Sequence, residues 1–329
     1  MHNKSPKFIS SEAYGTILTQ FLIDVAYEPP SWPCDQSLEE YAISYYRQQH
    51  DWTLQDRAHA LKMPVSIFLA ATRWYPHASK DAKATHSMLA SLPLLIEDIA
   101  RHTGLPLDTF APRLLADQLQ DHPVLQSLTQ LLRDLQVHLG PFARSVLLSS
   151  TIAFINGTFF EKSYEGRICP PKGATQFPEY LRVLTGIAEP FAHFIFAQKF
   201  PESEYLHVYL PVIPNITSIL CYVNDIMSFY KESIKGDEQL NFISNVANMR
   251  GITYLAALEW TCKQVCDKVG AVRAILREYA GLLEVFEDFL RGYISFHLEQ
   301  PRYKLEEVLA DLASGTKSQT DNRVIKYGA

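Results

Sequence analysis

The sequence lacks the patterns that mark several common classes of protein. Its five cysteines are an odd number without a Cys-x-x-Cys pair, which favours reduced thiols over a disulfide framework. Its 14 glycines are spread thinly and form no phosphate-cradling loop, so a nucleotide-binding fold is disfavoured. The eleven histidines include no His-Glu-x-x-His motif of a metalloprotease.

Charge and hydropathy give no sign of a nucleic-acid partner or a membrane span. The net charge of −6 is spread along 329 residues, so no basic face is evident. The first seven residues lack the apolar core of a signal peptide, and the most apolar later stretches contain Pro211 and Pro214. We therefore expect a cytoplasmic protein whose partner is a small molecule, and the sequence leaves a homodimer open.

The hydrophobic content of 47% and the helical spacing of apolar residues predict an all-α chain large enough for a substantial core. No stretch has the alternation of a β-strand, and no repeat is visible. We expect one domain over residues 1–329, with flexible ends at 1–10 and 314–329. Helices are expected over 13–26, 37–71 with a break at Pro64, 79–102, 140–160, from Pro178 onward, 252–269 and 272–298.

A polar string from Asn224 to Glu232 lies inside an otherwise apolar, aromatic helix. At about 3.6 residues per turn, Asn224, Ser228 and Glu232 fall in one row. An amide oxygen, a hydroxyl and a carboxylate form a hard oxygen site that suits Mg²⁺, with phosphate oxygens of a substrate completing the coordination. Lys231 lies on the same face, where its ammonium could meet that phosphate.

The alternative interpretation of this string is an amphipathic helix whose polar stripe faces water. Asn, Ser, Lys and Glu are common surface residues, so spacing alone favours that interpretation. However, the stripe is flanked and interleaved by large apolar side chains. These surroundings predict a buried helix, in which polar groups need partners such as a metal ion and a polyanion.

The segment from Asn224 to Glu232 resembles the second metal-binding motif of class I terpene cyclases, in the form found in fungal trichodiene synthase-type sesquiterpene cyclases. Arg182 resembles the diphosphate-sensing arginine of that family, and Arg302-Tyr303 resembles its late Arg-Tyr pair. The order of motifs agrees from about residue 60 to 310. The resemblance implies a single-domain helical bundle with a central active-site cavity, and a helix break near Gly186 that approaches the substrate.

The family's first, aspartate-rich motif corresponds to Glu97-Asp98-Ile99-Ala100-Arg101. This is a departure, because Glu97 replaces the leading aspartate and Arg101 stands where a third acidic group is expected. Adjacent carboxylates on a helix point about 100° apart, so only one is expected to reach the metal. We select Asp98, with Glu97 as the alternative; an ordinary acidic patch at the end of a helix is the competing interpretation.

The resemblance implies a lyase that ionises farnesyl diphosphate with Mg²⁺ and cyclises the resulting carbocation. Asp98, Asn224, Ser228 and Glu232 are then the catalytic metal ligands, and Arg182, Lys231, Arg302 and Tyr303 bind the diphosphate. Aromatic side chains are expected to line a cation pocket, for which the candidates are Trp74, Tyr75, Phe154, Phe191, Tyr222 and Phe296. For these aromatics, packing in the core is the simpler interpretation.

Within the family, the altered first motif favours a humulene-type product over a trichodiene-type product. Two alternatives remain beside a cyclase. A chain-elongating prenyltransferase would share the fold and the Mg²⁺ chemistry, but it should carry two aspartate-rich motifs. An inactive helical terpenoid-binding scaffold would account for the altered first motif. A Mg²⁺-independent hydrolase is disfavoured because no Ser, His and Asp set is evident.

Overall fold

The computed structural model describes residues 9–164, 167, 171, 173–236 and 241–309, and every regular element in these ranges is helical. This confirms the all-α prediction. The expected flexible ends fall mostly outside the described residues. The helices are α1 (Ser11–Asp24), α2 (Glu39–Arg47), α3 (Leu54–Lys62), α4 (Pro64–Ala71), α5 (Lys80–His102), α6 (Phe110–Leu115), α7 (Pro123–Leu135), α8 (Pro141–Tyr164), α9 (Phe177–Gly186), α10 (Ala188–Ala197), α11 (Glu202–Tyr209), α12 (Ile213–Phe229), α13 (Phe242–Arg250), α14 (Tyr254–Leu276) and α15 (Ala280–Glu299).

Shorter helical turns connect several of these helices. One of them, η6, is a single π-helical segment that continues α12. The remaining turns are 3-10 helices, namely η1 (Gln36–Leu38), η2 (Thr72–Trp74), η3 (Leu107–Thr109), η4 (Gln136–His138), η5 (Leu210–Val212) and η7 (Pro301–Tyr303).

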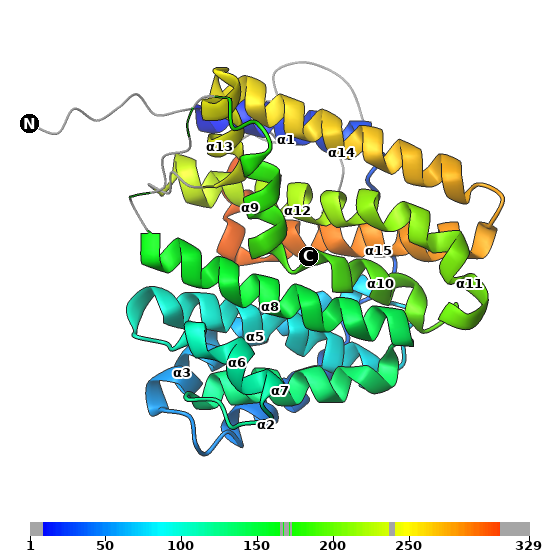
Figure 1. Cartoon of the computed structure of the whole chain (residues 1–329). Helices are drawn as coiled ribbons and strands as arrows, with labels where there is room; N and C mark the ends of the chain where they lie inside the picture. Colours follow the sequence, from blue (N-terminus) through cyan, green and yellow to red (C-terminus); the bar gives the residue numbers. More distant parts are fainter. Residues whose placement is uncertain (1–8, 165–166, 168–170, 172, 237–240, 310–329) are drawn as a thin grey trace, which may run out of the picture.

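Helix α12 lies in the middle of the bundle. Figure 1 shows α1 and α14 along one side of it and α5, α7 and α8 on the other, with α15 running behind. Helix α12 packs against α14 and α10, while α5 packs against α4, α7 and α8. A helix surrounded in this way should be apolar on most sides, and the residues of α12 from Ile219 to Val223 are all buried. The prediction that the polar string belongs to a buried helix is therefore confirmed.

Local sequence signals explain where several helices begin. Ser10, Ser79 and Thr253 each place a side-chain oxygen on a backbone N–H of the first turn of α1, α5 and α14, respectively. Pro64 occupies the first turn of α4, where its missing N–H costs nothing, so the expected break at this proline is confirmed.

The expected boundary between the last two long helices is wrong. We expected a break between residues 269 and 272, but α14 continues to Leu276 and α15 begins at Ala280. Val269 and Val272 are both buried in the interior of one helix. A single glycine costs only about 1 kcal/mol in a helix, which this burial outweighs, so Gly270 does not interrupt α14.

The expected break near Gly186 is present. Helix α9 ends at Gly186, α10 begins at Ala188, and Ile187 between them has a left-handed backbone conformation with φ of 42°. A branched side chain rarely adopts this conformation, so the surrounding structure must hold it in place. The break turns the chain beside the centre of α12.

The continuous helical run Glu202–Ile234 is long and apolar enough to cross a membrane by length and composition, and half of its apolar window is buried inside the protein. A core helix of a soluble protein passes the same test. The expected absence of a membrane span therefore stays a prediction.

Candidate active site

A cavity of about 260 Å³ lies between α5, α8, α9, α10, α12 and α15. Along α5, α12 and α15 its lining changes from apolar to polar toward the C-terminal end of the helix. We call the polar part the polar wall, formed by Glu97, Arg182, Asn224, Ser228, Lys231, Glu232, Arg302 and Tyr303. The C-terminal ends of helices attract cations, because the helix dipole places partial negative charge there.

The predicted row on α12 reaches the cavity as a unit. Asn224, Ser228 and Glu232 all line it. The row is not one regular α-helix, however, because α12 ends at Phe229 and a π-helical turn, Tyr230–Ile234, carries Glu232. π-turns are rare and occur often at functional sites. Here the wider turn still leaves the amide, the hydroxyl and the carboxylate on the same wall.

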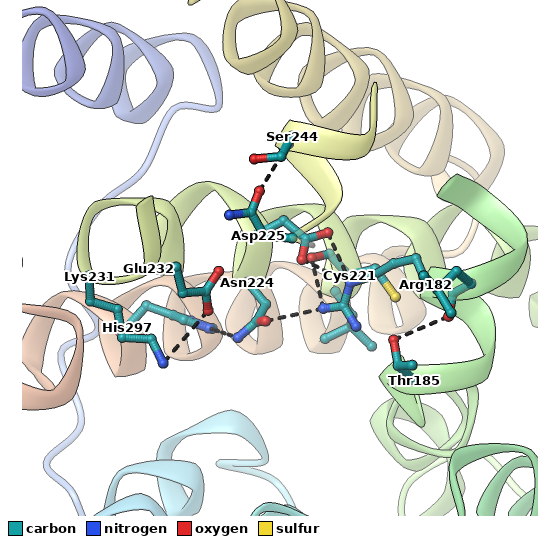
Figure 2. Close-up of polar contacts among 12 residues, drawn as sticks. Arg182, Thr185, Cys221, Asn224, Asp225, Lys231, Glu232, Ser244 and His297 are labelled. Carbon is teal, nitrogen blue, oxygen red and sulfur yellow. Dashed lines mark hydrogen bonds and ion pairs between the residues drawn. The ribbon is translucent and has the colours of Figure 1, made fainter. Parts of the chain in front are cut away.

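Arg182 of α9 is tied to the start of this row. Its Nε lies 2.9 Å from each carboxylate oxygen of Asp225, and its Nη2 donates to the Asn224 side-chain oxygen at 3.1 Å and to the Cys221 carbonyl at 3.3 Å (Figure 2). Gly186 makes this approach feasible, since a Cβ there would lie 2.9 Å from the Arg182 guanidinium and 3.0 Å from the Cys221 sulfur. The ion pair links helices that meet only in the folded chain.

The electrostatics of this ion pair follow from its burial. Burial disfavours the charge on the guanidinium, but the carboxylate of Asp225 outweighs burial and raises the pKa of Arg182. Burial also raises the pKa of Asp225 to about 6, with Arg182 acting in the opposite direction. Both groups are therefore charged at neutral pH, and Arg182 remains a cation at the edge of the cavity.

His297 of α15 contacts the other side of the Asn224 amide. Its Nε2 lies 3.2 Å from Asn224 Nδ2, and its Nδ1 lies 2.8 Å from the Tyr293 carbonyl oxygen. The Tyr303 hydroxyl is 3.4 Å from the same Asn224 nitrogen. Burial lowers the pKa of His297 to about 3, so the ring is neutral.

The structure places Glu97, and not Asp98, on the wall of the cavity. This corrects the expected placement of Asp98, which lies 3.2 Å from His59 Nε2 and 3.8 Å from Arg302 Nη1. Glu97 pairs with Arg101 at 2.6 Å, one turn further along α5. The orientation of α5 against α4 and α7 decides which carboxylate points inward, and that orientation depends on tertiary packing.

Lys231 and the Arg302-Tyr303 pair complete the polar wall. The ammonium of Lys231 lies 3.6 Å from Glu232 and 5.8 Å from the centre of the Tyr303 ring. Arg302 contacts Asp98 and also donates to the Met63 sulfur at 3.6 Å. Tyr303 is 5% exposed, and burial raises the pKa of its hydroxyl, which therefore stays protonated.

The apolar part of the cavity contains aliphatic side chains and a group of rings that we call the aromatic wall, namely Trp74, Phe154, Phe191, Tyr293 and Phe296. Trp74 lies at its centre, with ring centroids 5.4 Å from Phe191, 4.9 Å from Tyr293 and 5.0 Å from Phe296, each in an edge-to-face arrangement. This geometry is the favourable one for aromatic pairs, so it fixes the shape of the wall.

Two aromatic candidates from the sequence do not line this cavity. Tyr75 donates from its hydroxyl to the Phe191 carbonyl at 3.2 Å and packs behind the aromatic wall. Tyr222 donates to Glu179 at 2.6 Å and stacks on Phe242. Neither ring is among the residues that line the cavity, so the structure does not bring these two candidates into the cation pocket.

The charges on the cavity lining balance. Four carboxylates face four cationic side chains, namely Glu97, Glu161, Asp225 and Glu232 against Arg101, Arg182, Lys231 and Arg302. Oxygen donors of Asn224, Ser228 and Glu232 on one wall, with Glu97 from α5, fit a hard divalent cation such as Mg²⁺. The cations beside them fit the phosphate groups of an anion bound together with the metal.

The sequence motifs missed two residues that organise this site. Asp225 lies inside the polar string, but its role became visible only through Arg182, which is 43 residues away in the sequence. His297 contacts Asn224 across 73 residues. Its position five residues before Arg302 was visible in the sequence, but the spacing alone gives no reason to connect it with α12.

The all-helical bundle and its cavity, with an Asn-Ser-Glu row facing a buried arginine, define a class I terpene synthase. The linalool/nerolidol synthase from Streptomyces clavuligerus, solved with 2-fluorogeranyl diphosphate, has the same fold at a TM-score of 0.65; the match is 12% identical and covers 85% of this chain and 99% of that one.

The family model for trichodiene synthase (TRI5) matches residues 32–328, so the chain belongs to the trichodiene synthase family of terpene synthases, which are lyases. The chain is 31% identical over 300 residues to the (E)-beta farnesene synthase of Metarhizium brunneum, a match that covers 90% of this chain and 89% of that protein. It is 23% identical over 309 residues to the trichodiene synthase of Trichoderma arundinaceum, covering 90% and 78%.

Proposed function

We propose that this terpene synthase ionises farnesyl diphosphate in a Mg²⁺-dependent reaction, cyclises the carbocation to a C15 product and releases diphosphate. The observation that carries the proposal is the polar wall, where oxygen donors of Asn224, Ser228 and Glu232 lie beside the cations of Arg182 and Lys231. The similarity to farnesene and trichodiene synthases supports the C15 substrate.

In the first step, some residues of the polar wall would bind the metal and others would bind the diphosphate. Asn224, Ser228, Glu232 and Glu97 would hold the metal, which when bound supplies Lewis-acid neutralisation of the leaving diphosphate. We assign Glu97 to this role in place of Asp98 because Glu97 lines the cavity.

The cations and the buried phenol would hold the diphosphate itself. Arg182, Lys231, Arg302 and Tyr303 would donate hydrogen bonds to its oxygens as the carbon–oxygen bond breaks and negative charge develops. Asp98 would then act on Arg302, which it contacts at 3.8 Å.

The aromatic wall would protect the carbocation after the diphosphate has left. Each ring can stabilise a cation over its face by about 0.5 to 2 kcal/mol, and the wall excludes the water that would quench it. The described residues need not supply a general base, because the released diphosphate can accept the terminating proton. The contour of this wall decides the product; a humulene-type product is our prediction and a trichodiene-type product the alternative.

The test is to incubate the purified protein with farnesyl diphosphate and Mg²⁺, beside an identical sample with chelator, and to identify volatile products by gas chromatography and mass spectrometry. We expect a cyclic C15 hydrocarbon that disappears with the chelator. Geranyl diphosphate in a parallel sample tests a C10 substrate, and added isopentenyl diphosphate tests a prenyltransferase. A longer prenyl diphosphate in that last sample, or no product from any substrate, would contradict the proposal.

We further propose a cytoplasmic location and no membrane span for the enzyme, which the burial of half the apolar window of Glu202–Ile234 supports. Expression of the full chain followed by separation of soluble and membrane fractions tests this. Recovery only with the membrane fraction would contradict it.

A further inference from the structure

The Asn224 carboxamide has two ends of similar shape but opposite chemistry. Its oxygen can accept from a donor or bind a cation, whereas its amino group can only donate. A metal-binding asparagine must present the oxygen, so a rotation of half a turn about the last side-chain bond would remove the ligand. Neighbouring groups must therefore fix one of the two orientations, and the contacts around Asn224 show which groups these are.

The contact made by Nδ1 of His297 determines which ring nitrogen carries the proton. Nδ1 lies 2.8 Å from the Tyr293 carbonyl oxygen, which can only accept, so Nδ1 carries the proton. The ring is fully buried, with 0% of His297 exposed, and its other nitrogen meets the Asn224 amino group, which can only donate. Its Nε2 therefore carries a lone pair, and this lone pair faces the Asn224 amide nitrogen at 3.2 Å.

The contact on the oxygen side of the Asn224 amide independently indicates the same orientation. Arg182 Nη2, which can only donate, lies 3.1 Å from the Asn224 oxygen. If the amide were rotated, its oxygen would face the Nε2 lone pair and its amino group would face the guanidinium. Both contacts would become repulsive, and a buried mismatch of this kind costs about 1 to 3 kcal/mol for each unsatisfied group.

We infer that His297 is a positioning residue, which receives the amino group of Asn224 and thereby holds the amide oxygen on the side of Arg182, where it is available as a metal ligand. Figure 2 shows the line of contacts from His297 on α15 through Asn224 on α12 to Arg182 on α9. The inference rests on the proposed function, since it gives Asn224 the role of a metal ligand. It adds a residue that no motif of the sequence identified.

A matched pair of variants separates this role from simple packing. Glutamine in His297→Gln can place its amide oxygen near the position of Nε2, so it keeps an acceptor for Asn224. Asparagine in His297→Asn can keep the contact to the Tyr293 carbonyl but is too short to reach Asn224. Both are polar amides in the same buried site, and circular dichroism and the melting temperature without ligand verify that each is folded.

The measurement is the Mg²⁺ concentration that gives half of the thermal stabilisation produced by MgCl₂ with inorganic diphosphate. We expect His297→Gln to stay within about threefold of the unmodified protein, and His297→Asn to need about 10 to 100 times more Mg²⁺, the usual cost of losing a residue that orients a metal ligand. If His297→Asn does not fold, His297→Leu serves as the variant without an acceptor.

The second part of the experiment repeats the comparison of the His297 variants in a protein that also carries Asn224→Asp. A carboxylate has oxygen at both ends, so its orientation no longer matters, and the difference between the His297 variants should shrink to within about threefold. An undiminished difference there, or no difference in the original background, would overturn the positioning role alone. If the unmodified protein is not stabilised by Mg²⁺ with diphosphate, the proposed function fails as well.

Discussion

The polar wall and the aromatic wall line the same cavity, but different elements carry them and different forces hold them. At the polar wall, Arg182 and Asn224 form a continuous line of charged and neutral hydrogen bonds with the adjacent Asp225 and His297, across α9, α12 and α15. On the aromatic wall, Trp74 and its neighbours are held by edge-to-face packing. Hydrogen bonds fix single atoms, whereas packing fixes a surface.

This difference assigns a different kind of control to each wall. Directional contacts on the polar wall place the few atoms that would meet the metal and diphosphate, so a change there should affect whether ionisation occurs. The packed rings set the contour around the hydrocarbon chain, so a change there should affect which product forms. The following variants test that division, from the largest expected effect to the smallest.

Removing a ligand from the row on α12 should have the largest effect. We expect Asn224→Ala and Glu232→Ala each to lower Mg²⁺-dependent turnover by about 10³-fold, because charge stabilisation in the transition state is lost. Steady-state release of diphosphate measures this, and circular dichroism checks that the fold is intact. Full activity in either variant would refute the assignment of the row.

Arg182→Lys tests the link between α9 and α12. Lysine keeps the charge but lacks the planar group that contacts Asp225 through Nε and Asn224 through Nη2, so we expect kcat to fall by about 10²-fold and the protein to become less stable. Arg133→Lys, which changes an exposed ion pair on α7, is the matched control and should behave like the unmodified protein. Equal effects in the two variants would mean that the geometry at Arg182 does not matter.

Glu97→Gln and Asp98→Asn test the corrected placement on α5. We expect Glu97→Gln to raise the half-saturating Mg²⁺ concentration by about tenfold, because it weakens a charged oxygen ligand. Asp98→Asn should instead raise the KM for farnesyl diphosphate, through Arg302, and leave the Mg²⁺ requirement nearly unchanged. The reverse pattern in a titration of both ligands would restore the expectation made from the sequence.

Substitutions in the aromatic wall should change the proportions of the products more than the turnover rate. Trp74→Phe and Phe296→Leu should change turnover by about thirtyfold or less, since a single ring contributes about 0.5 to 2 kcal/mol to a cation. The proportions of C15 products seen by gas chromatography should shift. Tyr222→Phe, whose ring stacks on Phe242 and does not itself line the cavity, should leave those proportions unchanged. A change in product proportions in this control would show that the aromatic wall alone does not determine the shape of the cavity around the hydrocarbon chain.

His193 on α10 should affect stability without affecting chemistry. Burial lowers the pKa of His193 to about 4, and neither ring nitrogen has a hydrogen-bond partner among the described residues. The unfolded chain takes up this proton below about pH 6.5 while the folded chain does not, so stability falls as the pH drops toward 4. Between pH 7.5 and 5 we expect a loss of about 2 kcal/mol in the free energy of unfolding.

Urea unfolding at the two pH values measures this loss, with His193→Leu as the comparison. The variant should lack most of the pH-dependent difference and should keep normal turnover, because His193 does not line the cavity. An unchanged pH dependence in His193→Leu would assign the effect to other groups. Glu202, whose charge raises the pKa of His193, is the first neighbour to change in that case.

Much of the fold could be predicted because its signals are local. Helix α5 was expected over residues 79–102 and spans Lys80–His102, because the N-cap at Ser79 and the apolar periodicity act within a few residues. The break after Gly186 was expected from a resemblance of motifs and lies where the chain turns. The limits of α14 and α15 were wrong because burial of Val269 and Val272 outweighs the weak signal of one glycine.

The candidate site was predictable where one helix carries it and unpredictable where helices meet. Spacing placed Asn224, Ser228 and Glu232 on one face, and all three line the cavity, even with a π-turn inside the row. The choice between Glu97 and Asp98 depended on how α5 is rotated against its neighbours. The sequence contains no measure of that rotation, which comes from packing with α4, α7 and α8.

The sequence by itself determined an all-helical chain with a polar row inside an apolar helix, because periodicity and residue chemistry act over one or two turns. Only the tertiary structure decided that Arg182 meets Asp225, that His297 contacts Asn224, and that Tyr75 and Tyr222 do not line the cavity. Those contacts join residues far apart in the chain, so they exist only once the helices have packed and closed the distance between them.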